Sequence, residues 1–197
     1  MWLVNWFKSA LEGLGLMNKK GKIVFLGLDD AGKTTLLLRL KEDVMKQMDP
    51  TQQPYSEELV MGKNTNNVGK VRFKAWDLGG HEAARKTWRN YVSDVDGIIY
   101  LVDSSNVKRF EESRVELQGV LEMPELQKVP IVILGNKIDK AGAVPEEELR
   151  EALGLEPKGM IDYGKEKGSR PVEVFMCSVA KRMGYTDAFK WLSGYLK

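Results

Sequence analysis

Short runs of apolar residues recur along this chain, and longer stretches of helical character separate them. The apolar runs that predict strands cover residues 22–26, 97–102, 129–134 and 172–176. The stretches that predict helices cover residues 34–47, 107–121, 145–153 and 186–196. Uninterrupted apolar runs suit strands that are buried on both faces, and strands that alternate with helices indicate a parallel sheet with crossover helices. The pattern therefore predicts an α/β domain with helices on both faces of its sheet.

Residues 57–76 depart from this alternation. Residues 59–61 and 71–76 are strand-like, and the stretch of residues 62–69 between them is polar and contains Gly and Asn. Turn residues between two strand-like runs indicate a hairpin, here with a long tip. With these two strands the predicted sheet is six-stranded and mostly parallel.

The first fourteen residues predict an amphipathic helix. On a helical wheel one narrow arc is polar, and apolar side chains fill the rest. The polar arc holds Asn5, Lys8, Ser9 and Glu12. Such an apolar stripe can pack on the core, but Trp2, Trp6 and Phe7 favour a helix that lies in a membrane interface, and the two arrangements can alternate. We expect residues 1–20 to be a membrane-binding segment, with residues 2–14 in contact with lipid, and residues 21–197 to form the domain.

The composition is that of an ordinary globular protein. The 197 residues suffice for one domain with a substantial core. A net charge of +2 gives no electrostatic reason to bind nucleic acid. The single cysteine, Cys177, excludes an internal disulfide and a cysteine metal cluster, which suits a reducing compartment. We expect no transmembrane helix, signal peptide or lipid-modification site, because no apolar stretch approaches about 18 residues and neither end carries the required motif.

Residues 27–34, with the sequence GLDDAGKT, match the phosphate-loop pattern at every fixed position. The glycines let successive N–H groups point inward as a nest for anions, and the following helix adds its positive N-terminal end. Lys33 supplies an ammonium group for the β- and γ-phosphates, and Thr34 supplies a hydroxyl group for Mg²⁺. The residues predicted to bind the nucleotide here are Asp30, Ala31, Gly32, Lys33, Thr34 and Thr35.

Two carboxylates, those of Asp29 and Asp30, lie within this loop. Close to bound phosphates they are electrostatically unfavourable. The repulsion is avoided if the side chains point away from the phosphates or face the metal ion, and the sequence leaves both arrangements open.

A second polar motif, residues 76–81, ends the second strand of the hairpin. Asp77 stands where such folds place the carboxylate that organises Mg²⁺, directly or through water. Gly79 and Gly80 let the backbone approach a γ-phosphate, whose presence an N–H group can detect. His81 is the only histidine of the chain. A lone histidine is more often structural, but its place directly after Asp-Leu-Gly-Gly predicts a catalytic residue that orients the attacking water.

Asn136-Lys137-Ile138-Asp139 follows the third apolar run. Asp139 can accept hydrogen bonds from the N1–H and the 2-amino group of guanine, and adenine, which lacks both donors, would leave this carboxylate unpaired. Lys137 can lay its aliphatic stem along the base, and Asn136 can tie this segment to the phosphate loop. The four residues alone could form a plain polar loop, but with the phosphate loop and Asp77 they predict a site for GTP or GDP.

A weaker element, residues 177–180, follows the last apolar run. A backbone N–H in this segment can bond the guanine carbonyl group, and Ser178 and Val179 are the predicted donors, with a register that is open by one residue. Cys177 is most simply a buried apolar side chain.

These motifs together resemble the Ras-like small GTPases. Residues 27–35 are similar to the phosphate loop of the Arf/Sar branch, and His81, where Arf proteins carry glutamine, resembles the Sar subgroup. Residues 50–59, 174–179 and 191–195 resemble that subgroup as well. The resemblance covers essentially the whole chain and implies the P-loop small GTPase fold.

The resemblance also implies a role. Sar GTPases insert their N-terminal helix into the endoplasmic reticulum membrane in the GTP state and recruit the inner coat of coat protein complex II for transport to the Golgi. A membrane exchange factor loads GTP, and coat subunits stimulate the slow GTP hydrolysis. By this resemblance Thr51 meets Mg²⁺ and the γ-phosphate in the GTP state, and residues 47–56 and 77–91 form two switches. The chain is then expected in the cytoplasm, cycling to the cytosolic face of the endoplasmic reticulum, with the Golgi as a further membrane.

Three features depart from the subgroup. Asp30 replaces its usual asparagine, the hairpin tip at residues 63–69 is longer, and Gln52, Gln53 and Tyr55 differ from its switch residues. The alternative functions are an Arf-like GTPase at another membrane and a GTP-bound membrane adaptor without useful catalysis. An ATP-using P-loop protein is disfavoured by Asp139.

Overall fold

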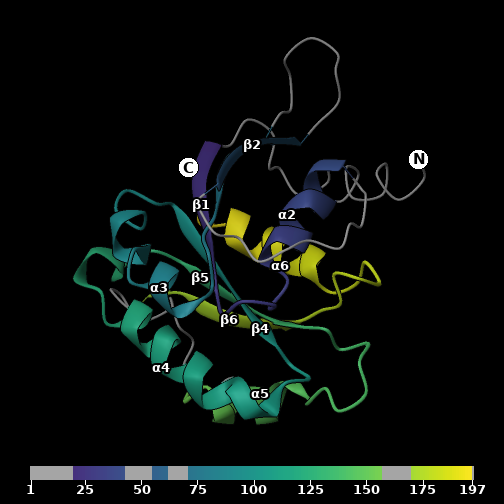
Figure 1. Cartoon of the computed structure of the whole chain (residues 1–197). Coiled ribbons are helices and arrows are strands. Elements are labelled where there is room, and N and C mark those ends of the chain that lie inside the picture. Colours follow the sequence, from purple (N-terminus) through teal and green to yellow (C-terminus); the bar gives the residue numbers. More distant parts are fainter. Residues whose placement is uncertain (1–19, 43–54, 62–70, 157–169, 197) are drawn as a thin grey trace.

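In the part of the chain that the structure describes, six strands form a single sheet, and helices cover both of its faces (Figure 1). The strands are β1 Lys20–Leu26, β2 Tyr55–Met61, β3 Val71–Asp77, β4 Gly97–Asp103, β5 Ile131–Asn136 and β6 Val172–Met176. Their order across the sheet is β2-β3-β1-β4-β5-β6. Every neighbouring pair is parallel except β2 and β3, which form the antiparallel hairpin. The predicted α/β fold with a mostly parallel sheet is confirmed.

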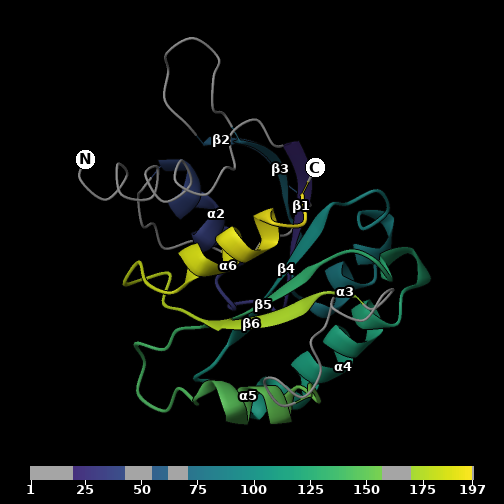
Figure 2. The ribbon, with the colours of Figure 1, turned by 180° about the vertical axis from the view of Figure 1, so that it is seen from behind.

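The helices lie in two layers, one on each face of the sheet. They are α2 Lys33–Glu42, α3 Glu82–Arg85, α4 Phe110–Leu121, α5 Glu146–Ala152 and α6 Tyr185–Ser193, with short 3-10 helices η1 Trp88–Asn90, η2 Val107–Arg109 and η3 Pro124–Leu126. Helices α2 and α6 cover one face, and α3, α4 and α5 cover the other (Figures 1 and 2). The helix predicted at residues 107–121 is present, but its first turn, η2, is a 3-10 helix. Within the part of the chain that the structure describes, no helix has the length and apolarity needed to cross a membrane.

This computed structural model describes residues 20–42, 55–61, 71–156 and 170–196, and for residues 20, 41–42, 55–61 and 71–77 the description is of the backbone. Several predicted features lie wholly or partly outside the described residues. They are the amphipathic helix of residues 1–14, the end of the helix predicted at residues 34–47, the first switch at residues 47–56 with Thr51, and the hairpin tip at residues 63–69.

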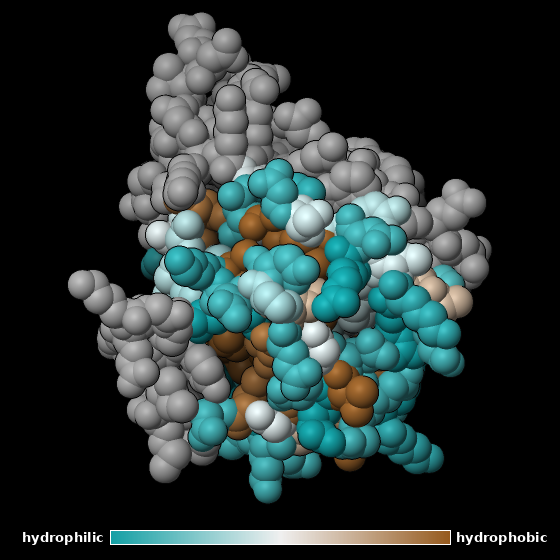
Figure 3. Space-filling model, turned by 90° about the vertical axis from the view of Figure 1, so that its left-hand side faces the viewer, coloured by the Kyte–Doolittle hydropathy of each residue, from teal (hydrophilic) through white to brown (hydrophobic). Residues whose placement is uncertain are grey.

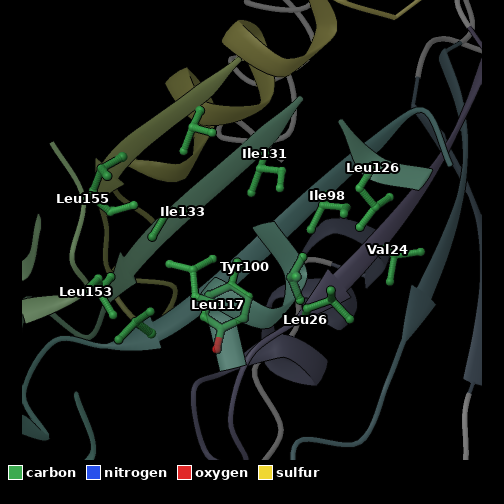
Figure 4. Close-up of a cluster of buried hydrophobic side chains, with 14 of the residues drawn as sticks. Val24, Leu26, Ile98, Tyr100, Leu117, Leu126, Ile131, Ile133, Leu153 and Leu155 are labelled. Atoms are coloured by element: carbon green, nitrogen blue, oxygen red, sulfur yellow. The ribbon is translucent and has the colours of Figure 1, made fainter. Parts of the chain in front are cut away.

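Apolar side chains pack on both faces of the sheet. Successive strand residues point to opposite faces, so Ile23 and Phe25 of β1 belong to the cluster under α2 and α6, while Val24 and Leu26 belong to the cluster under α4 and α5. Figure 4 shows the second of these clusters. On the surface drawn in Figure 3, hydrophilic residues predominate and apolar atoms appear as patches between them. The continuous apolar runs of the strands are thus explained by burial on both sides.

Tyr100 of β4 connects the second cluster to its helices (Figure 4). Its hydroxyl group donates a hydrogen bond of 3.0 Å to the main-chain oxygen of Ser113 in α4. Trp88 meets the Tyr100 ring edge to face, with 6.3 Å between ring centroids. Burial is the main reason why the pKa of Tyr100 is raised, so its hydroxyl group stays a donor. Trp88 and Tyr100 thereby fasten the segment after α3 to the sheet.

The carboxyl ends of the central strands lie at one edge of the sheet. Phe25 of β1 is in register with Asp77 of β3, and Asp103 of β4 is in register with Asn136 of β5. The loops that follow these strands therefore leave the same edge, which is where open α/β sheets bind ligands.

Leu117→Ala tests the packing of α4. Leu117 is fully buried in the second cluster, so its truncation should lower the free energy of unfolding by about 2–5 kcal/mol. Val115, on the same helix but 57% exposed, is the control, and Val115→Ala should change this free energy by less than about 0.5 kcal/mol. Urea unfolding of both variants measures the difference, and equal losses would contradict the packing described here.

Candidate functional site

The loop between β1 and α2 has the backbone geometry that a phosphate loop requires. Gly27 has a φ of +129°, and a Cβ atom there would come within 2.2 Å of the main-chain oxygen of Leu101. Gly32 has a φ of +100°, and a Cβ atom there would come within 2.4 Å of the side-chain nitrogen of Asn136. Both positions therefore need glycine, and the loop lies directly against β4 and β5.

Lys33 folds its side chain back over this loop. Its ammonium group donates hydrogen bonds of 2.8 Å to the main-chain oxygens of Gly27 and Leu28, and the residue is only 5% exposed. Thr34 and Thr35 follow in the first turn of α2. A positive charge and the N-terminal end of α2 thus meet at one place, which favours an anion.

The two carboxylates of the loop are each paired with a cation from a distant segment. The Asp29 carboxylate accepts a bond of 2.8 Å from Arg109 at the end of η2, and the Asp30 carboxylate lies 3.0 Å from the Lys137 ammonium group. The bond from Arg109 is the largest influence on the pKa of Asp29, outweighs its desolvation and lowers this pKa. The sequence left open whether these side chains point away from the phosphates or face the metal ion, and the structure adds that both are paired with cationic side chains of other segments.

The turn after β3 comes close to the phosphate loop. A Cβ atom at Gly80 would lie 2.2 Å from the Asp29 main-chain nitrogen, so Gly80 permits this close approach. The Trp88 indole N–H donates a bond of 3.0 Å to the Gly79 main-chain oxygen and fixes the turn. His81 follows, and its Nδ1 atom is buried and has no hydrogen-bond partner among the described residues.

Asn136 joins three loops, two through its side chain and one through its main chain. Its amide nitrogen donates a bond of 2.9 Å to the main-chain oxygen of Ala31 in the phosphate loop. Its amide oxygen accepts a bond of 3.0 Å from the main-chain N–H of Val179. The Asn136 main-chain oxygen accepts bonds from the N–H and the hydroxyl group of Ser104, which follows β4. The predicted tie to the phosphate loop is present, and it extends to the loops after β4 and β6.

Lys137 lies between two carboxylates. Its ammonium group is 2.8 Å from Asp103 and 3.0 Å from Asp30. Burial is the largest influence and lowers the pKa of Lys137, but the bonds to Asp103 and Asp30 together outweigh it and raise this pKa. Lys137 therefore stays charged and links the loop after β5 to the end of β4 and to the phosphate loop.

Asp139 is exposed at the end of the same loop and is oriented by Ser178. The buried Ser178 hydroxyl group donates to one carboxylate oxygen, and this bond is the main reason why the pKa of Asp139 is lowered. An ionised, oriented carboxylate at this position can accept hydrogen bonds from a planar base edge. Ser178 thus reaches the site through its side chain, and the Val179 N–H is already bonded to Asn136.

The chain is similar to known proteins over nearly its whole length. Residues 7–196 match the model of the ADP-ribosylation factor family. The chain belongs to this family. It is 51% identical to the small COPII coat GTPase SAR1 of Giardia intestinalis, over 98% of each chain, and 42% identical to the small COPII coat GTPase SAR1 of Nicotiana tabacum, over the full length of both. These relatives confirm the resemblance to the Sar subgroup.

The small GTPase fold is also found in a solved relative. The Arl6 (BBS3) small GTPase of Trypanosoma brucei, solved with the bound nucleotide analogue GppNp, aligns with a TM-score of 0.72 and 28% identity. The alignment covers 89% of this chain and 96% of that one.

Three residues that take part in the site of this chain were not predicted from the sequence. They are Asp103, which binds Lys137; Ser104, which binds Asn136; and Arg109, which binds Asp29. A signal was present for Asp103 and Ser104. They directly follow the apolar run of β4, and each of the predicted motifs likewise comes at the end of a strand. Arg109 offers no such signal, since it lies at the start of an ordinary charged helix.

Asn136→Ala tests the junction of the three loops. The substitution leaves the buried Ala31 oxygen and Val179 N–H without their shared partner, so we expect a loss of about 2 kcal/mol in the free energy of unfolding and at least about tenfold weaker GDP binding. Asn90→Ala, at an exposed position of η1, is the control and should change neither quantity measurably. Urea unfolding at a fixed GDP concentration and a GDP titration provide the two readouts. Wild-type values for Asn136→Ala would show that these side-chain bonds contribute neither to stability nor to GDP binding.

Proposed function

We propose that this chain is a small GTPase that binds and hydrolyses GTP and starts the assembly of the COPII coat. The observation that carries the proposal is the position of Asn136, whose side chain bonds both the phosphate loop and the loop after β6. In that second loop, the Ser178 hydroxyl group orients the Asp139 carboxylate. The SAR1 proteins that resemble the chain over its full length are small COPII coat GTPases. This likeness supports the proposal of the same role here.

The phosphate groups are bound by the loop before α2. In our proposal the N–H groups of residues 30–35 and the Lys33 ammonium group surround the β- and γ-phosphates, since nests of N–H groups and helix N-termini stabilise such anions. The bonds of Lys33 to the loop's own carbonyl oxygens indicate that its ammonium group is directed into this loop.

The guanine base is recognised by Asp139. Its carboxylate accepts hydrogen bonds from the N1–H and the 2-amino group, and the Ser178 hydroxyl group keeps it in position. Lys137 flanks the base with its aliphatic stem while Asp30 and Asp103 bind its ammonium group. The amide that bonds the guanine carbonyl group is better assigned to Ala180 than to Val179, because the Val179 N–H is bonded to Asn136.

The site fits a magnesium ion as cofactor. Mg²⁺ prefers oxygen ligands and is usually held by one or two protein groups together with substrate phosphates. Asp77 stands at the carboxyl end of β3, in register with β1 just before the phosphate loop, and Thr34 stands in the first turn of α2. We propose that Thr34 and Asp77, with Thr51 in the GTP state, hold this ion, which neutralises charge on the phosphates when it is bound.

Hydrolysis depends on His81. We propose that this side chain orients the attacking water, because positioning dominates phosphoryl transfer. The place of His81 directly after a turn that packs against the phosphate loop supports this role. Gly80 brings the backbone of the turn against the phosphate loop, where its N–H can respond to the γ-phosphate.

Membrane attachment completes the cycle. We propose that the segment of residues 1–20 inserts residues 2–14 into the endoplasmic reticulum membrane when GTP is bound to the domain of residues 21–197, and that the protein otherwise resides in the cytoplasm. A membrane exchange factor then loads GTP, and inner coat subunits stimulate its hydrolysis. The aromatic and apolar side chains of the segment supply the affinity for lipid.

His81→Gly tests the hydrolytic role. The variant should bind GTP as the wild type does, because the loop that holds the phosphates is unchanged. Its hydrolysis, stimulated by inner coat subunits, should fall by at least about a hundredfold, as for other groups that act in the transition state. Single-turnover phosphate release measures the rate, and normal turnover would remove His81 from the mechanism.

Co-sedimentation with liposomes tests the membrane role. The full chain should sediment with a non-hydrolysable GTP analogue and remain in solution with GDP, whereas a variant without residues 2–14 should remain in solution in both states. Inner coat subunits should sediment only with the full chain in the GTP state. Sedimentation that ignores the nucleotide would contradict the switch, and failure to recruit inner coat would favour an Arf-like GTPase of another membrane.

A further inference from the structure

A chain of ion pairs connects the phosphate loop to the segment that begins with His81. Arg109 donates 2.8 Å bonds to Asp29 in the phosphate loop and to Glu112 in α4. The same Glu112 accepts a bond of 2.6 Å from Arg85, at the end of α3, and Glu116 accepts a second one of 2.7 Å from Arg85. The two loops that face the nucleotide in the proposed function are therefore joined through α4.

Glu112 and Arg109, at the centre of this series of ion pairs, each bind more than one partner. One oxygen of Glu112 accepts bonds from both Arg85 and Arg109. Arg109 also donates a bond of 3.2 Å to the Asp29 main-chain oxygen, so that it holds the backbone of the phosphate loop as well as the carboxylate. The planar guanidinium group can serve these partners at once because its donors point in several fixed directions. A change in the position of one of these side chains is therefore expected to change the bonds of the others.

At the other end, Arg85 is nearly buried. Its side chain is 7% exposed, and its Nε atom has no hydrogen-bond partner among the described residues. The two glutamates of α4 therefore compensate its charge. The main-chain N–H of Arg85 donates a bond of 3.1 Å to the His81 main-chain oxygen, and this backbone contact ties the position of Arg85 to that of His81.

One ion pair of α4 is exposed and lies within the helix itself. Arg114 binds Glu111 within one helix, and the two side chains are 41% and 68% exposed. Pairs of this kind are screened by water and contribute little. Arg109, in contrast, joins segments that are 80 residues apart in the sequence.

We propose that Arg109 is a positioning residue that holds the Asp29 carboxylate away from the bound phosphates and couples the phosphate loop to α3 through Glu112 and Arg85. This inference rests on the proposed function, since it assigns the loop its phosphates. Without Arg109 the Asp29 charge is uncompensated and repels the nucleotide, and Glu112 keeps its bond to Arg85 but loses the partner that connects it to the phosphate loop.

The kinetics of GDP release test the charge compensation. With the full chain and a fluorescent GDP analogue, Arg109→Ala should release the nucleotide about three- to tenfold faster. Because the added repulsion comes from Asp29, the double variant Asp29→Asn/Arg109→Ala should release it within about twofold of Asp29→Asn alone. Arg114→Ala is the matched control and should behave as the wild type. If Arg109→Ala releases GDP at the wild-type rate, or if the double variant is as fast as Arg109→Ala, the proposal is overturned.

Amide hydrogen exchange tests the coupling to α3. In the GDP-bound full chain, exchange in residues 82–90 should be faster in Arg109→Ala and in Glu112→Gln than in the wild type or Arg114→Ala. Unchanged exchange there overturns the coupling. If Arg109→Ala does not fold, Arg109→Lys replaces it, since a single ammonium group cannot reproduce the forked bonds to Asp29 and Glu112. Wild-type protein that neither binds GDP nor hydrolyses GTP would instead refute the proposed function itself.

Discussion

The site depends on one buried side chain, that of Asn136. Its amide group has a donor and an acceptor, and here each serves the backbone of a different loop. A planar amide offers both functions in fixed geometry. Because the residue lies at the end of β5, the central sheet sets its position, and the loops after β1 and β6 are positioned from it. The accuracy of the nucleotide pocket therefore derives from the strand register.

Three acidic side chains at or beside the phosphate loop are paired with two cations. Arg109 compensates Asp29, and Lys137 compensates Asp30 and Asp103. Several of these groups are partly exposed, so each pair contributes modestly to stability. Their effect is more important for binding, because an uncompensated carboxylate beside the phosphates would oppose the charge of the ligand. Asp30 fits this scheme because its αL conformation, with a φ of 59°, brings it to Lys137.

Much of the fold could be predicted because burial on both faces leaves a direct trace in the sequence. β4 and β5 appear as continuous apolar runs, and the phosphate loop and Asn136–Asp139 are contiguous motifs whose spacing encodes their chemistry. The four-residue α3 could not be predicted, since its position depends on Trp88 packing against Tyr100 rather than on a pattern of its own. Arg109 could not be predicted for a similar reason, because its partner Asp29 lies 80 residues away in the sequence.

The central claim is that loops from separate strand ends form a single pocket that recognises guanine through Asp139. Isothermal titration calorimetry of the full chain with GDP and with ADP, both in the presence of Mg²⁺, tests it directly. The account predicts one binding site per chain and an affinity for GDP that exceeds that for ADP by at least about a thousandfold, because adenine would leave the carboxylate unpaired. Equal affinities for the two nucleotides, or no heat of binding with GDP, would contradict it.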